Sequence, residues 1–112
     1  ISWNSDEIST GRWAIKNITT LLKKNKIAVN AVIVPYLKKK YTYDEQLSYL
    51  SMKKLLNEFS IKHLDLHGKF KDIEDARWRR EKSDSVHPSE AGHRLMSEHI
   101  HSFLINNFEH KH

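Results

Sequence analysis

Three stretches of the chain repeat apolar residues at the three- and four-residue spacing of an amphipathic helix. The first covers residues 10–25 and the second covers residues 43–59. The third starts at Pro88 or Ser89, because proline fits the first turn of a helix, and it continues to near the C-terminus. We therefore predict three helices that each bury one apolar face.

Two other stretches have the composition of β-strands. Residues 27–34 are almost continuously apolar and stop at Pro35, a pattern typical of a strand that is buried on both faces of a parallel sheet. Residues 61–67 place Leu64 and Leu66 on one face and mainly polar side chains on the other. This alternation predicts a strand near the edge of a sheet.

Residues 70–82 are polar and predict a loop or short helix that Ile73 and Trp78 hold against the body of the protein. The order of elements is then helix, strand, helix, strand, loop and helix, which is half of a doubly wound α/β sandwich. Two parallel strands do not form a stable sheet by themselves. We therefore expect a preceding segment or another chain to complete the sheet.

The composition is that of one small globular domain. The chain has 112 residues, of which 38% are hydrophobic and 29% are charged. No apolar run approaches the roughly 20 residues that cross a bilayer, and no signal peptide is visible. Because the chain begins with Ile1, we expect it to be processed or to be a piece of a longer polypeptide. The absence of cysteine excludes disulfides and a thiol nucleophile, and it leaves the cellular compartment open.

The net charge of +5 comes from lysines spread along the chain, and basic residues also form two clusters. One cluster is residues 38–40, and the other comprises Arg77, Arg79, Arg80 and Lys82. Clusters of this kind bind phosphate backbones in some proteins. Since no nucleic-acid-binding motif accompanies the charge, we favour a solvated surface and predict no nucleic-acid partner.

The most informative stretch is Asp84-Ser85-Val86-His87-Pro88, which lies just before the last predicted helix. A histidine that is held by a carboxylate through one ring nitrogen has its other nitrogen free to take a proton from a hydroxyl nucleophile. That is the acid–base chemistry of an ester hydrolase. The alternative is a structural loop in which Asp84 acts as a cap and His87 lies on the surface.

This loop, the Gly92-His93 pair and the elements before them resemble the C-terminal half of an SGNH (GDSL-type) hydrolase. The resemblance implies that residues 1–112 are the C-terminal part of a single domain. It implies an α/β fold, namely a flavodoxin-like three-layer α/β/α sandwich with a parallel sheet, completed by a missing N-terminal segment or another chain. It also implies that Asp84 is the acid of a catalytic triad and that His87 is its base.

The same resemblance implies an oxyanion-hole role for Asn4. The family places such an asparagine in a G-x-N-D block, and this chain has Ser2-Trp3-Asn4-Ser5-Asp6 in the corresponding place. The block departs from the pattern at the glycine, which is Ser2, and at the aspartate, which is Ser5. A loop or helix-capping residue is the other interpretation of Asn4.

The family's nucleophilic serine, which sits in a G-D-S block, has no counterpart in the chain. The glycines are Gly11, Gly68 and Gly92, and none precedes a serine in that context. We therefore expect an N-terminal segment of the same protein, or a companion chain, to carry the serine, and we expect the isolated chain to be inactive. The predicted reaction is hydrolysis of an O-acyl ester of a carbohydrate, lipid or small molecule. The alternatives are an acyltransferase with the same triad and a non-catalytic basic α/β binding module.

The remaining histidines and Trp78 carry weaker signals. His63 and His67 are four residues apart in an extended strand, about 13 Å, which is too far for one metal ion. We predict no metal and no cofactor. Trp78 either lines a pocket for an anionic or sugar substrate or anchors residues 70–82 in the core. We favour the role as a core anchor.

Overall fold

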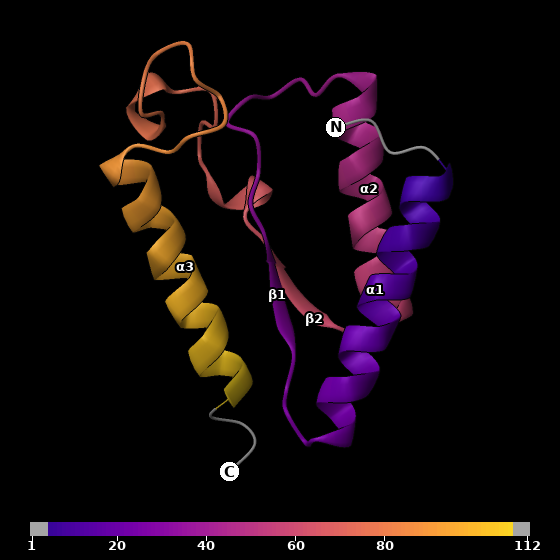
Figure 1. Cartoon of the computed structure of the whole chain (residues 1–112). Coiled ribbons are helices and arrows are strands. Elements are labelled where there is room, and N and C mark those ends of the chain that lie inside the picture. Colours follow the sequence, from indigo (N-terminus) through magenta and orange to yellow (C-terminus); the bar gives the residue numbers. More distant parts are fainter. Residues whose placement is uncertain (1–4, 109–112) are drawn as a thin grey trace. The chain divides into compact units, whose positions relative to one another are not determined.

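The computed structural model describes residues 5–108, so the predicted oxyanion residue Asn4 lies outside the described residues. Helices and strands alternate along the chain, as Figure 1 shows. The elements are α1 (Ser5–Lys24), β1 (Asn30–Ile33), α2 (Tyr43–Glu58), β2 (Lys62–Asp65), the 3-10 helices η1 (His67–Lys69) and η2 (Ala76–Trp78), and α3 (Glu90–Phe108). Within residues 5–108, no helix is both long enough and apolar enough to cross a membrane.

The three predicted helices are confirmed, with one correction to their bounds. α2 starts at Tyr43 as predicted, where the side chains of Thr42 and Glu45 form a reciprocal capping box. α1 starts at Ser5 and not at residue 10. The apolar periodicity begins only at residue 10, whereas the acidic sequence before it is favourable at a helix N-terminus.

The two strands pair into a small parallel sheet, which confirms a mixed α/β architecture. The pairing continues past the strand ends, where the Leu66 N–H donates to the Ile33 carbonyl at 3.1 Å. The expectation that residues 27–34 are buried on both faces is wrong for this structure. β1 is only half-buried, and Ile27 and Val34 on either side of it are 52% and 60% exposed. Among the described residues, β1 pairs with β2 alone. The other edge of β1 therefore has no partner strand in this part of the chain.

Contacts within the chain divide it into two compact units. The first consists of the described parts of residues 1–31 and 41–63, in which α1 packs against α2. The Arg12 guanidinium pairs with the Glu58 carboxylate at 2.6 Å and lies over the ring of Phe59. The buried side chains of this unit come mainly from the end of α2 and the residues after it, and they are Thr19, Leu55, Leu56 and Ile61.

The second unit consists of residues 32–40 and the described part of residues 64–112, and it contains the predicted acid–base loop. Its core is formed by six buried apolar side chains, Leu37, Leu64, Leu66, Phe70, Ile73 and Met96. Trp78 from η2 and Leu95 from α3 pack against this core. The polar stretch 70–82 is thus held to the body through Ile73 and Trp78, as predicted, although it contains only the single turn of η2.

Candidate active site

The Asp84 carboxylate organises the loop of residues 84–88 through one of its two oxygens. Asp84 Oδ1 accepts hydrogen bonds from the backbone N–H groups of Val86 at 2.9 Å and His87 at 3.0 Å. Aspartate commonly makes such bonds to the backbone two and three residues later, and they hold the loop in a tight turn. The turn brings the side chain of His87 back to its own aspartate.

The second carboxylate oxygen binds the histidine ring. Asp84 Oδ2 lies 2.8 Å from His87 Nδ1. The N–H groups of His87 and Val86, and then the His87 imidazole, lower the pKa of Asp84 from 3.8 to about 2. The carboxylate is therefore ionised at neutral pH and only accepts hydrogen bonds, so Nδ1 is the donor. In the neutral ring this leaves Nε2 without a proton and able to accept one.

His87 is accessible, whereas Asp84 is largely covered. The side chain of His87 is 66% exposed and that of Asp84 is 25% exposed. Among the described residues no serine hydroxyl is hydrogen-bonded to the His87 ring. The arrangement can therefore accept a proton from a hydroxyl group that approaches Nε2 from outside these residues.

Arg79 fixes this loop to the segment that follows β1. Its guanidinium donates to the Leu37 carbonyl from Nη2 at 2.6 Å and from Nε at 3.1 Å, and to the Lys82 carbonyl from Nη1 at 2.9 Å. The Leu37 N–H in turn donates to the Ser85 carbonyl at 2.7 Å. Because Leu37 is only 1% exposed, these bonds tie the loop to the core of the second unit.

A short antiparallel pairing also holds the backbone of His87. Arg79 and Pro88 form a β-bridge, with hydrogen bonds from the Arg80 N–H to the His87 carbonyl at 2.9 Å and from the Ser89 N–H to the Trp78 carbonyl at 2.8 Å. Residues 78–80 therefore run alongside residues 87–89.

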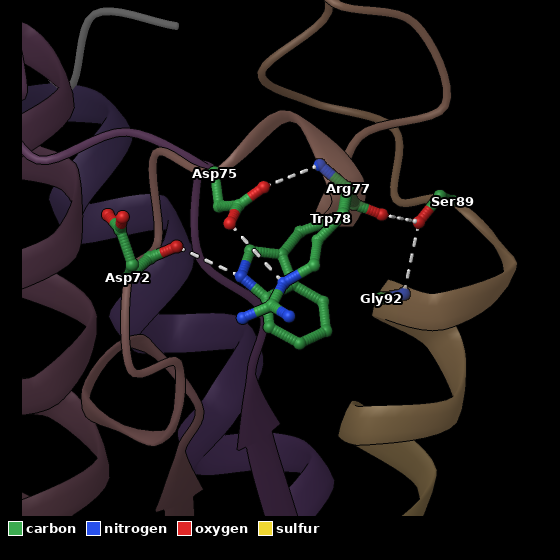
Figure 2. Close-up of polar contacts among 6 residues, drawn as sticks. All are labelled: Asp72, Asp75, Arg77, Trp78, Ser89 and Gly92. Carbon is green, nitrogen blue, oxygen red and sulfur yellow. Dashed lines mark hydrogen bonds and ion pairs between the residues drawn. The ribbon is translucent and has the colours of Figure 1, made fainter.

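The start of α3 is joined to η2 by one serine, as Figure 2 shows. The Ser89 hydroxyl donates to the Arg77 carbonyl and accepts from the Gly92 N–H at 3.1 Å, so Ser89 caps the helix. Gly92 approaches η2 so closely that a Cβ on it would lie 2.5 Å from the Trp78 carbonyl oxygen. The Ser89 cap agrees with the predicted helix start, whereas the packing role of Gly92 was not predicted.

Trp78 and Arg77 form a second polar cluster in Figure 2. The Trp78 Nε1–H donates to the Asp72 carbonyl at 2.9 Å, and its ring packs edge-on against Phe70 with centroids 5.4 Å apart. The Arg77 guanidinium lies over the Trp78 ring at 4.5 Å and pairs with Asp75 at 3.4 Å. These contacts agree with the core-anchoring interpretation of Trp78.

The chain matches a protein-family model. The GDSL-like lipase/acylhydrolase model matches residues 14–100. The chain belongs to this family. The resemblance to SGNH (GDSL-type) hydrolases is thereby confirmed, and the matched region includes Asp84 and His87. No curated protein and no solved structure matches the chain.

Two other histidines of this GDSL-like chain take part in local hydrogen bonds. His63 Nδ1 lies 3.0 Å from the Ile61 carbonyl, and the His67 N–H donates to Asp65 Oδ1 at 3.0 Å. Across the described part of the chain, no three His, Asp or Glu side chains are grouped closely enough to hold a metal ion.

The Asp84 carboxyl should titrate near pH 2 in the folded chain, as followed by the carboxyl carbon in NMR spectra. Its pKa is lower in the folded than in the unfolded state, so its contribution to stability is complete above pH 3.8 and is lost as the pH falls through about 2. In His87→Ala the two backbone donors remain, and the midpoint should stay below 3.8. A midpoint of 3.8 in the unmodified chain would contradict the observed loop geometry.

Replacement of Gly92 by alanine should lower the free energy of unfolding by about 1–3 kcal/mol, because the new methyl group meets the Trp78 carbonyl. Elsewhere in a helix the same change stabilises by roughly 0.5–1 kcal/mol. Gly68→Ala is the matched control, since a Cβ there meets nothing within 4 Å. Urea unfolding followed by circular dichroism measures both, and a Gly92→Ala variant as stable as the control would rule out the close contact.

Proposed function

We propose that this chain supplies the acid and base of a serine esterase, with Asp84 holding the imidazole and His87 transferring the protons. The single observation that carries the proposal is the 2.8 Å contact between Asp84 Oδ2 and His87 Nδ1, in a loop whose backbone holds the same carboxylate. Membership in the GDSL-like lipase/acylhydrolase family supports the same class of reaction.

The nucleophilic serine comes from a segment that precedes this sequence in the same polypeptide, or from a companion chain. That segment also adds strands to the sheet and completes a three-layer α/β/α sandwich of which residues 1–112 are the C-terminal part. The half-buried state of β1 supports this arrangement, since a parallel strand of this composition requires partners on both edges.

The reaction proceeds in two acyl transfers. His87 Nε2 takes the serine proton while the serine oxygen bonds to the ester carbonyl carbon, and the resulting imidazolium is stabilised by Asp84. His87 then donates that proton to the alcohol oxygen as the carbon–oxygen bond of the ester breaks. Water attacks the acyl-serine in the same way, giving its proton to Nε2, which returns it to the serine oxygen as the acid leaves.

Asn4 is proposed to stabilise the negative charge on the carbonyl oxygen by donating its side-chain amide. A single donor of this kind contributes roughly 3 kcal/mol to transition-state stabilisation in well-studied hydrolases. The substrate is an O-acyl ester of a carbohydrate, a lipid or a small alcohol. The chain requires no metal and no cofactor for this chemistry.

The test is esterase activity of the full-length polypeptide, including the segment that carries the serine, on an activated acetate ester. His87→Ala should lower kcat by about 10³-fold or more, and Asp84→Asn by a factor on the order of 10³–10⁴, because each change disrupts the acid–base pair.

His93→Ala is the matched control, because His93 is an exposed histidine in the first turn of α3. It should leave kcat within about twofold of the unmodified protein. Unchanged activity in His87→Ala would contradict the proposed role of His87 as the base, whatever the identity of the nucleophile.

A further inference from the structure

The short pairing beside the active loop places Arg80 directly across from His87. In the register set by the Arg79–Pro88 bridge, Arg80 is the residue opposite His87, and their backbones are joined by the 2.9 Å bond from the Arg80 N–H to the His87 carbonyl. Side chains at opposite positions of an antiparallel pair have Cβ atoms about 4.5–5.5 Å apart.

Within residues 5–108, Arg80 differs from the neighbouring arginines because its guanidinium has no protein partner there. Arg77 is held by Asp75 and Trp78, Arg79 by two carbonyl groups, and Arg94 by Glu90 at 3.0 Å. Arg80 is exposed, and no hydrogen bond or ion pair of its guanidinium is found among residues 5–108. It is therefore available to bind a ligand.

The side chains of Arg79 and Arg80 have different surroundings. The extended Arg79 directs its guanidinium to the buried Leu37 carbonyl, whereas Arg80 lies at a bend and is exposed. Arg80 and His87 are thus two exposed residues that face one another across the pairing.

Arg80 and Lys82 are the positive charges at this position, and Glu81 and Asp84 are the negative ones. Lys82 is also exposed and has no side-chain partner within the described residues. The Asp84 carboxylate is occupied by His87 and two backbone N–H groups, and Glu81 is the other acidic residue of the segment. The planar fork of an arginine matches the oxygens of a carboxylate or a phosphate.

We propose that Arg80 binds a negatively charged group, a phosphate or a carboxylate, on the alcohol part of the ester substrate. This inference depends on the proposed function. His87 must donate its proton to the alcohol oxygen, so Nε2 contacts the alcohol side of the ester and not the acyl chain. A residue beside His87 therefore recognises the alcohol, and the preferred substrates are esters of anionic alcohols.

The test compares acetate esters that differ only in the charge of the alcohol, hydrolysed by the full-length polypeptide. The series comprises 2-acetoxyethyl phosphate, 3-acetoxypropionate, the neutral 2-methoxyethyl acetate and the cationic acetylcholine. Arg80→Gln should lower kcat/KM about tenfold or more for the anionic esters, because a charge-assisted hydrogen bond is lost, and less than twofold for the neutral one. Arg80→Lys should restore part of the loss.

Arg94→Gln is the matched control, since Arg94 is an exposed arginine on α3 that is paired with Glu90. It should change no ester's kcat/KM by more than about twofold. The two anionic esters show whether phosphate or carboxylate is preferred. The neutral ester reports on folding, because a misfolded variant would lose activity on all four.

The outcomes separate this inference from the proposed function. If His87→Ala abolishes hydrolysis of every ester while Arg80→Gln reduces only the anionic ones, both proposals are supported. If Arg80→Gln has the circular-dichroism spectrum of the unmodified protein and changes kcat/KM of all four esters equally, or of none, the anion site is overturned and the role of His87 stands. If His87→Ala leaves the neutral ester unaffected, the proposed function itself fails.

Discussion

The hydrogen bonds to the two oxygens of Asp84 determine the chemistry that this structure supports. One oxygen accepts two backbone N–H groups of its own loop and the other accepts the imidazole, so the loop conformation and the ring orientation are set by the same carboxylate. The backbone bonds also keep the carboxylate ionised. An ionised carboxylate fixes which ring nitrogen carries the proton, and that choice decides whether His87 can act as a base.

A small loop needs support from the rest of the fold to hold such a geometry. Arg79 and the Leu37 backbone connect it to the core of the second unit, and the Ser89 cap connects its end to η2 and α3. Each of these bonds has a backbone N–H or carbonyl group as one partner. Such a group is present whatever side chain its residue carries. The acid–base loop is therefore attached at both of its ends.

The sequence predicted the local features well and the long-range ones poorly. The Asp84–His87 contact spans three residues, so their spacing alone suggested it. The apolar periodicity located α2 and α3 but not the first turn of α1, since that turn precedes the apolar stripe. The role of Arg79 depends on a carbonyl 42 residues away, and nothing in the sequence distinguished it from Arg77 or Arg80. Gly92 was missed for the same reason, because its constraint is the position of Trp78 in space.

The protonation of the His87 ring tests the central claim most directly, and it requires no nucleophile, substrate or second chain. Proton–nitrogen NMR spectra of the ring, recorded at a pH where imidazoles are neutral, distinguish the two tautomers. We predict that the proton resides on Nδ1 and that Nε2 has the shift of an unprotonated acceptor, and that Asp84→Ala abolishes this preference. A proton on Nε2 in the unmodified chain would contradict the proposed role of His87 as the base.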